Sequence, residues 1–300
     1  MPQYSVVIPS VKRTFPALLS VVEHECQEGA PSPKIIVFGV TANMVALYAA
    51  FFRQVSSLPV YELQSRLSQG ARTRTTSEFK EAASGIMFAT DVIGRGMDFP
   101  NVTSVIQVGL PTSGDQYVHR VGRTARVDKD GRAVILLTEA ESFFLRNNPN
   151  LPIKPYEHLI NKTESEATSR AMESIDERTK QKAYAAYIGF MKGSMNKLRV
   201  TPEGLVAIAN ELAMQAFHCP EPPPMKKATV GKMGLKGVAG IRYGNIEDDD
   251  ESAPKRVKRD YEQRTVRAAL SRGEAVEKAP RSRGGARGGR RAATSKLSMA

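Results

Sequence analysis

Short apolar runs recur through residues 1–150, and their spacing limits the fold more than any other feature of the sequence. They are rich in valine and isoleucine, as is typical of strands that are buried on both faces. The runs are Lys34–Gly39, Pro59–Leu63, Gly85–Ala89, Thr103–Val108 and Ala133–Leu137. Segments with helical spacing of apolar residues, such as Ala42–Val55, separate them. Strands alternating with helices predict an α/β fold, in which helices cover both faces of a parallel sheet.

The sequence changes character after residue 150 and again after residue 220. Residues 151–220 show no strand pattern, and their apolar spacing predicts three helices, at Glu164–Ile175, Arg178–Leu198 and Pro202–Phe217. Thr201 suits the cap of the last helix, and proline is favoured at the first helical position. We therefore expect an α/β domain over residues 1–150 and an all-helical extension over residues 151–220.

Residues 221–300 have the composition of a tail rather than of a domain. Beyond an acidic patch at residues 247–251, Lys, Arg, Gly and Ser dominate, while Leu, Ile, Val and Phe are scarce. Such a segment buries too little apolar area to offset the entropy of ordering the chain. We expect most of it to be disordered, although Gly231–Tyr243 has enough apolar residues to dock on the helical region.

Most of the positive charge lies in this tail. The net charge of the chain is +12. Residues 251–300 hold 14 Lys and Arg against 5 Asp and Glu, a net +9, which leaves +3 for residues 1–250. A nearly neutral body with a basic arm indicates a polyanionic partner, either nucleic acid or an anionic membrane surface.

Other classes of protein find little support in the sequence. No apolar run approaches the ~20 residues that span a membrane, and the first residues show neither a signal-peptide nor a presequence pattern. The two cysteines, Cys26 and Cys219, are too far apart in sequence to suggest a disulfide framework or metal ligands. We therefore expect no membrane partner and no metal ligands in this chain, and no pattern points to a homo-oligomer.

The segment His119–Arg126, with the sequence HRVGRTAR, is the most informative. It holds three arginines and a histidine within eight residues. Guanidinium groups match phosphate oxygens, and arginines that one domain supplies to a phosphoryl group on another stabilise the transition state. Taken alone, the segment could equally be a solvated basic loop.

A second polar segment, Ala89–Asp98 (ATDVIGRGMD), directly follows a buried strand. Ligands of open parallel sheets bind outside the carboxyl ends of the strands. The segment offers there a hydroxyl, two carboxylates, two glycines and an arginine, on Thr90, Asp91, Asp98, Gly94, Gly96 and Arg95. Two weaker elements, Ile35–Thr41 (IIVFGVT) and Gln69–Arg72 (QGAR), end in groups that could touch a nucleic-acid backbone. A core strand and a surface arginine explain these two as well.

In this order and spacing, the four segments resemble motifs IV, IVa, V and VI of DEAD-box RNA helicases, over roughly residues 3–147. The resemblance implies a RecA-like domain, the second of a pair, with Tyr4–Pro9 as the end of the interdomain linker. Ala125 is the one departure in motif VI, where the family often has glycine. The helical extension, the glycine-containing segment Gly231–Gly244 and the basic tail resemble the subgroup of fungal mitochondrial splicing-factor helicases and their plant organellar relatives.

The resemblance also implies roles for residues. Arg123 and Arg126 match arginine fingers that reach the γ-phosphate of ATP on the other domain, and His119 and Arg120 match residues that link the two domains. Gly96, Asp98 and Arg95 match the ATP-side interface. The matches to RNA-contacting positions are Thr41, Gln69, Arg72, Thr90, Asp91 and Gly94. In the tail, Arg281–Arg291 is an RGG-type run whose Arg287, Arg290 and Arg291 suit backbone neutralisation and base stacking.

The chain carries no phosphate-cradling GxxxxGK[ST] loop and no acidic Mg²⁺ motif in a foldable segment. We therefore expect ATP and Mg²⁺ as cofactors of a longer protein, with the Mg²⁺ site in the missing N-terminal RecA-like domain. The chain alone should then be inactive as an ATPase.

The leading hypothesis is an ATP-dependent RNA helicase or RNA chaperone that binds RNA without sequence preference. The alternative is a non-catalytic RNA-binding and annealing module. His119 disfavours a third reading, a DNA-directed helicase. The subgroup favours the mitochondrial matrix, although Lys255–Arg259 also resembles a nuclear import signal.

Overall fold

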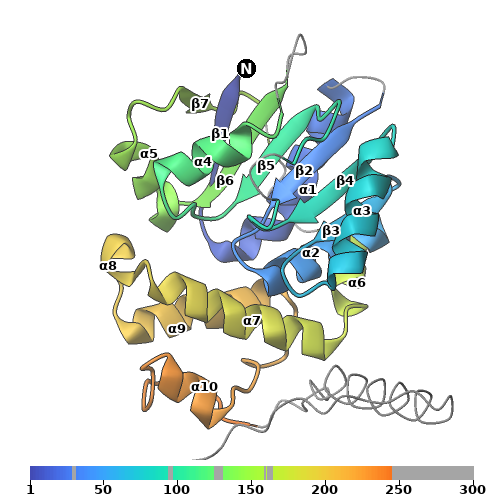
Figure 1. Cartoon of the computed structure of the whole chain (residues 1–300). Coiled ribbons are helices and arrows are strands. Elements are labelled where there is room, and N and C mark those ends of the chain that lie inside the picture. The colour runs from blue at the N-terminus through green and yellow to red at the C-terminus, as the bar shows by residue number, and fades with distance from the viewer. Residues whose placement is uncertain (29–31, 94–96, 125–130, 159, 161–164, 245–300) are drawn as a thin grey trace, which may run out of the picture. The chain divides into compact units, whose positions relative to one another are not determined.

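The structure is a computed structural model that describes residues 1–28, 32–93, 97–124, 131–158, 160 and 165–244. Seven parallel strands form one sheet in the order β3-β4-β2-β5-β6-β1-β7 (Figure 1). The strands are β1 (Gln3–Ile8), β2 (Lys34–Phe38), β3 (Val60–Leu63), β4 (Gly85–Ala89), β5 (Ser104–Val108), β6 (Arg132–Thr138) and β7 (Ile153–Pro155). The predicted α/β class with a parallel sheet is confirmed.

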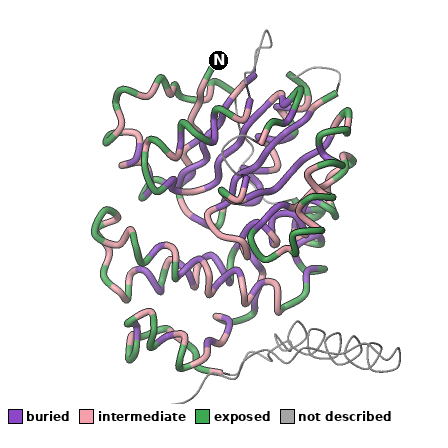
Figure 2. Tube along the Cα trace, viewed as in Figure 1, coloured by how far each residue is buried: buried purple, intermediate pink, exposed green. Residues whose placement is uncertain are grey.

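Alternate residues of the central strands enter two different apolar clusters, because successive side chains of a strand point to opposite faces. Ile35 and Val37 of β2 pack with the helices α1 (Thr14–Glu28) and α2 (Ala42–Val55). Ile36 and Phe38 pack with Phe79 of α3 on the other face. Helices α3 (Gln69–Glu81) and α4 (Gly114–Val121) lie in front of the sheet, and α1 lies behind it (Figure 1). The strands between them are buried along their length (Figure 2).

Two elements of the structure differ from the sequence predictions. Tyr4–Pro9, predicted as the end of a linker, supplies β1, which pairs along six residues with β6 and also with β7. Its Val6 and Ile8 are buried, so the segment contributes to the core instead of lying outside it. Strand β7 lies in the region predicted to hold only helices. It has three residues, and none of them is fully buried, so it leaves no periodic signal in the sequence.

The helical extension begins with α6 (Glu166–Glu173) and α7 (Glu177–Lys192) and continues with α8 (Met195–Leu198) and α9 (Pro202–Glu211). Thr201 caps α9 as predicted, since its hydroxyl accepts a hydrogen bond from the Gly204 amide at 3.1 Å. A π-helical turn, Leu212–Ala216, follows α9. The single predicted helix Arg178–Leu198 is instead two helices, because Gly193 ends α7.

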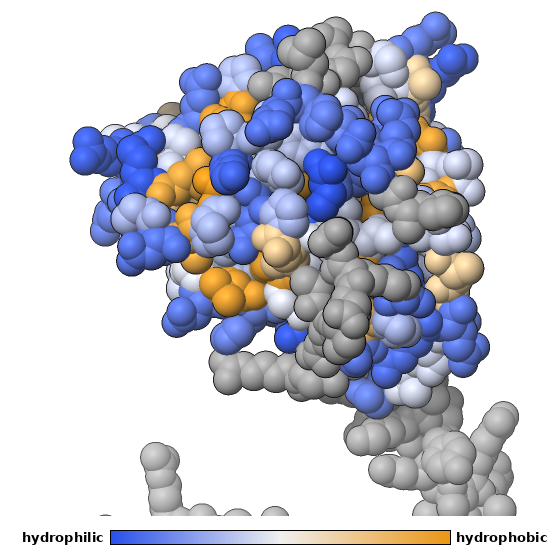
Figure 3. Space-filling view, turned by 90° about the horizontal axis from the view of Figure 1, so that it is seen from above, coloured by the Kyte–Doolittle hydropathy of each residue, from blue (hydrophilic) through white to orange (hydrophobic). Residues whose placement is uncertain are grey.

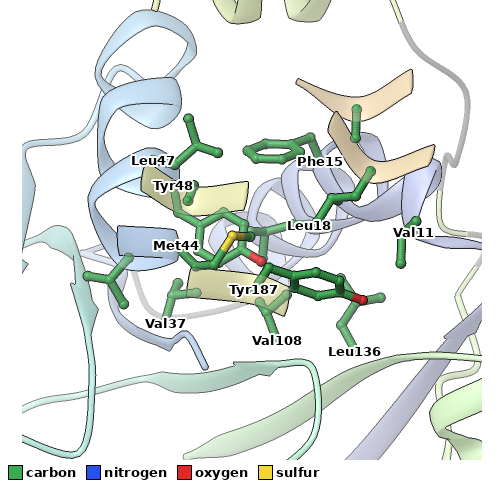
Figure 4. Packing of buried hydrophobic residues seen from close by; sticks show 14 of the residues in the cluster. Val11, Phe15, Leu18, Val37, Met44, Leu47, Tyr48, Val108, Leu136 and Tyr187 are labelled. Carbon is green, nitrogen blue, oxygen red and sulfur yellow. The ribbon is translucent and has the colours of Figure 1, made fainter. Parts of the chain in front are cut away.

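The extension shares the apolar core of the sheet domain. Tyr187 of α7 lies among Val11, Met44, Tyr48 and Leu136, which come from the sheet and its helices (Figure 4). The Asn43 amide at the start of α2 also donates a hydrogen bond to the Lys182 carbonyl of α7, at 2.9 Å. The extension is therefore packed on the face that α1 and α2 cover, through side chains that are themselves buried.

Residues 221–244, predicted to begin the tail, are ordered against the extension. Met225, Val230 and Leu235 are buried. Val230 lies on the short helix α10 (Lys227–Lys232), and the other two lie on either side of this helix in the sequence. The Asn210 amide of α9 donates to the Gly240 carbonyl at 3.0 Å, so Gly231–Tyr243 docks on the helical region as expected. These three apolar side chains are enough to hold the segment, although its overall composition is polar. Residues 245–300 lie outside the described residues.

The surface of the described residues is mostly polar. Seen from above, it is mainly hydrophilic, with hydrophobic residues in separate patches (Figure 3). Met1, Val118, Met214 and Tyr243 are its exposed large hydrophobic residues. Among the described helices, none combines the length and the apolarity that crossing a membrane requires.

Candidate nucleotide and nucleic-acid interface

Four predicted RNA-contacting residues lie at one edge of the sheet. Strands β3, β4 and β2 are neighbours and end in register, with Leu63 and Phe38 both opposite Ala89. Thr90 directly follows β4, Thr41 caps the helix after β2, and Gln69 and Arg72 begin the helix after β3. Since parallel strands end at the same edge, the fold brings together residues that are up to 49 positions apart in sequence.

The polar groups at this edge are only partly engaged. The Thr41 hydroxyl oxygen accepts from the Met44 amide at 3.2 Å, which fixes the side chain and leaves its proton able to donate. The Arg72 Nε lies buried without a hydrogen-bond partner, and so does the Thr76 hydroxyl one turn later on α3. Leaving a guanidinium nitrogen unpaired is costly, so Arg72 stays a candidate for binding an acceptor such as a phosphate oxygen once its side chain moves.

Asp91 anchors α4 to the segment that follows β4. Its two carboxylate oxygens accept from Arg120, Nε to Oδ1 at 2.7 Å and Nη2 to Oδ2 at 2.8 Å. The Gln116 amide donates to the same Oδ2 at 2.9 Å. The Asp91 side chain is also 49% exposed. Its predicted contact with RNA stays a prediction.

Arg120 is buried against the sheet. Only 4% of the residue is exposed, and its guanidinium lies 5.2 Å from the centre of the Phe38 ring. Its Nη1 also donates to the Gln107 amide oxygen at 3.5 Å. Gln116 and Arg120 are four residues apart on α4, so both face the sheet, while His119 is exposed. The predicted role of Arg120 between two domains stays a prediction.

Arg123 lies beside the segment that follows β4. Its Nη1 donates to the Met97 carbonyl at 2.9 Å, and its Nε donates to the His119 carbonyl at 3.2 Å. Asp98 comes directly after Met97 and is exposed, as is His119. Thr124 adds a further link, because its hydroxyl donates to the Val102 carbonyl at 2.7 Å. The described parts of HRVGRTAR and ATDVIGRGMD are therefore side by side.

Several predicted residues lie outside the described part of the chain: Gly94, Arg95, Gly96, Arg126, Arg287, Arg290 and Arg291. Conversely, sequence reasoning missed Gln116 and Asn43. Gln116 lies four residues before Arg120, so helical periodicity would have placed both on one face. Asn43 has no such signal, since its partners Lys182 and Arg66 are distant in sequence; Arg66 Nη1 donates to its Oδ1 at 2.6 Å.

The described residues suit one wall of a nucleotide site. The Arg123 guanidinium bonds the main-chain carbonyls of His119 and Met97, and Asp98 directly follows Met97, so the three residues lie on neighbouring stretches of backbone. No group of three or more His, Cys, Asp or Glu among the described residues could hold a metal ion. An arginine held beside the segment that follows β4 is suited to contact with an anion such as a phosphate group.

Removing the Asp91 carboxylate should destabilise the sheet domain. An Asp91→Ala variant leaves the buried Arg120 charge unpaired, so we expect a loss of roughly 2–4 kcal/mol in the free energy of unfolding. Arg120→Leu should cost less, because the Asp91 side chain is 49% exposed and water can solvate it. Urea unfolding of both variants measures the difference. Equal losses in the free energy of unfolding would contradict the expectation that Asp91→Ala costs more than Arg120→Leu.

Comparisons with known proteins agree with this geometry. Residues 16–128 match the family model of the helicase conserved C-terminal domain. The ATP-dependent RNA helicase mss116, mitochondrial, of Aspergillus oryzae is 56% identical over 302 residues, which cover 97% of this chain and 47% of that protein. This chain belongs to the DEAD-box helicase family. It spans about half the length of this relative.

Solved DEAD-box structures share the fold. Domain 2 of the helicase Mss116p bound to an RNA duplex has a TM-score of 0.67 over 83% of this chain and 100% of that one, at 23% identity. A deletion form of Mss116p bound to ssRNA and AMP-PNP has a TM-score of 0.66 over 82% of this chain and 50% of that one, at 22% identity. The DEAD-box match thus extends beyond the sheet domain into the helical extension.

Proposed function

We propose that this chain is the second RecA-like lobe of an ATP-dependent RNA helicase, gripping RNA at one sheet edge and completing a nucleotide pocket with another lobe. One observation carries the proposal: α4 and the β4–β5 connection are joined at both ends. Asp91 holds Gln116 and Arg120 at one end, and Arg123 and Thr124 hold the Met97 and Val102 carbonyls at the other. The RNA-side Thr90 and the nucleotide-side Arg123 therefore lie on two segments that are linked by hydrogen bonds at both ends.

On the RNA side, Thr41, Gln69, Arg72 and Thr90 would contact the sugar-phosphate backbone. Hydroxyls and guanidinium groups of this kind carry no base-edge code, so binding should be independent of sequence. The helical extension would lengthen this surface, since Asn43 joins the start of α2 to α7. Unwinding of structured RNA then follows from bending one strand when the two lobes close. RNA-chaperone activity is a part of this proposal.

On the nucleotide side, Arg123 and Arg126 would face the γ-phosphate of ATP, whose hydrolysis supplies the free energy for reopening the lobes. Asp98 would orient the ribose side, together with Gly96 and Arg95, while His119 would contact the other lobe. A guanidinium aimed at developing charge in a water-poor cleft stabilises the transition state. The Mg²⁺ that accompanies ATP would be held by the other lobe.

We further propose that the protein acts in mitochondria. The support is the printed name of the Aspergillus oryzae relative, which is mitochondrial. Immunofluorescence of the tagged natural protein against a matrix marker tests this, and a nuclear signal would support the alternative from Lys255–Arg259.

The central experiment fuses this chain to the part of the Aspergillus oryzae relative that it does not cover. The fusion should hydrolyse ATP faster when RNA is added and should separate a short RNA duplex with ATP. The 300-residue chain alone should bind RNA and hydrolyse no ATP. ATP hydrolysis by the chain alone would contradict the proposal that hydrolysis needs both lobes. A fusion that binds RNA but hydrolyses no ATP would favour the non-catalytic annealing module.

Deleting residues 251–300 tests how the body and the tail share RNA binding. The deletion removes a net charge of +9, so RNA affinity at 0.1 M salt should fall by about tenfold or more, and its salt dependence should become shallower. Fluorescence anisotropy with a labelled oligouridylate over a salt series measures both. Complete loss of binding would show that the tail binds alone, and the sheet edge would then carry no RNA function.

A further inference from the structure

The side chain of Gln116 links the turn that follows β4 to the start of α4, in addition to the ion pair that joins Asp91 to Arg120 near the end of α4. Its amide nitrogen donates to Asp91 Oδ2 at 2.9 Å, and its amide oxygen accepts from the Thr112 main-chain amide at 2.5 Å. Asp91 lies next to Thr90, the proposed RNA contact, and Thr112 lies in the loop before α4. A single carboxamide therefore bridges the turn at residues 90–93, which we call the RNA-side turn, and the beginning of α4.

The RNA-side turn has few other constraints on its position. The Thr90 amide bonds the Leu63 carbonyl at 3.3 Å, and the Ile93 amide bonds the Thr90 carbonyl at 3.3 Å, both long for such bonds. Asp91 thus depends for its place on Arg120, near the end of α4, and on Gln116, near its start. With both in place, α4 cannot tilt about either end without moving Asp91.

Helix α4 in turn sets the position of the arginine that follows it. Arg123 comes two residues after the end of α4 and is held to the His119 carbonyl within it. Any displacement of α4 therefore moves Arg123 relative to Met97. The contacts run without a gap from Thr90, through Asp91 and Gln116, along α4 to Arg123.

We propose that Gln116 is a positioning residue that couples RNA occupancy at Thr90 to the arginine-bearing end of α4. This inference rests on the proposed function, since it assigns a regulatory link within that same site. RNA bound at Thr90 immobilises the turn, and the Gln116 bridge passes this restraint to α4. Without the bridge, α4 can open locally while RNA stays bound.

Hydrogen exchange of the full chain with and without an oligouridylate tests the coupling. In the natural chain, RNA should slow amide exchange in residues 112–124. In Gln116→Met, which keeps the length of the side chain and removes both hydrogen bonds, the slowing should shrink by about fivefold or more, in the usual range of couplings between sites. RNA affinity and the melting temperature should stay unchanged, because the closed form of α4 still dominates.

Three further variants separate coupling from a merely structural role. Gln116→Lys can still donate to Asp91 and should keep most of the slowing, whereas Gln116→Glu places a second carboxylate there and should abolish it. Gln54→Met makes the same change at an exposed position of α2 and should leave exchange at residues 112–124 as in the natural chain.

Two outcomes would overturn the inference and can be told apart from failure of the proposed function. RNA binding without slowed exchange at residues 112–124, or equal slowing in the natural chain and Gln116→Met, removes Gln116 from the coupling while leaving the RNA-binding lobe intact. A chain that binds no RNA at all removes both proposals together.

Discussion

Arg123→Ala should lower the RNA-stimulated ATPase rate of the two-lobe fusion by about 1,000-fold or more, the usual contribution of an arginine finger. The guanidinium is already held by the carbonyls of Met97 and His119, so no reorganisation is needed when a nucleotide arrives. Arg123→Lys should also lose most of the rate, because an ammonium cannot hold both carbonyls and a phosphate in one plane. Steady-state phosphate release at saturating RNA and ATP gives the comparison.

Two controls make this result specific. Arg146→Ala removes an arginine of α5 (Phe143–Asn147) that donates to the hydroxyl of Ser142, the residue before this helix, and the ATPase rate should stay within twofold of the natural fusion. RNA affinity of Arg123→Ala should also be unchanged, because Arg123 is not one of the proposed RNA contacts. A rate for Arg123→Ala close to that of the Arg146→Ala control would refute the assignment of Arg123.

Tyr187→Ala should lower the free energy of unfolding by about 3–5 kcal/mol, as expected when a large aromatic side chain leaves a well-packed core. Tyr187 is 6% exposed and fills the packing interface between α7 and the sheet domain. Its removal leaves a cavity lined by side chains from α1, α2 and β6, which regular structure on both sides prevents from collapsing. Urea unfolding, followed by circular dichroism, measures the loss.

The hydroxyl and the ring of Tyr187 can be tested separately. Burial raises the pKa of this hydroxyl well above its ordinary value, so it stays protonated in neutral solution. Tyr187→Phe keeps the ring and should cost much less than Tyr187→Ala. Tyr243→Ala removes an exposed tyrosine and should change stability by less than about 1 kcal/mol. A loss at Tyr187→Ala no larger than this control would mean that the extension does not share the core.

The sequence alone was enough to predict the central strands and the polar segments that follow them. Runs such as Gly85–Ala89 are apolar on both faces, and that pattern has few alternatives once helices alternate with it. Thr90 and Arg123 carry motif patterns that helicases share, so the resemblance placed them in one site before their contacts were known. The structure then showed how the two are joined.

Other features had no signal that a single sequence could reveal. The motif match gives no sign that Arg120 is buried, whereas its position on α4 turns it towards the sheet, where it pairs with Asp91. Strand β1 is apolar enough to be a strand, but only its pairing with β6 shows that it is not a linker. Asn43 and Gln116 are ordinary polar residues whose partners are set by tertiary packing.

The packing interface around Tyr187 has an evolutionary consequence. An extension whose aromatic side chain fills the interior of the sheet domain cannot be exchanged between helicases as an independent cassette. A transplanted extension would leave Met44 and Tyr48 facing a void or a clash, unless the recipient's α1 and α2 changed with it. Divergence of the extension should therefore proceed by paired substitutions across this interface, while the solvent-facing side of α7 remains free to vary.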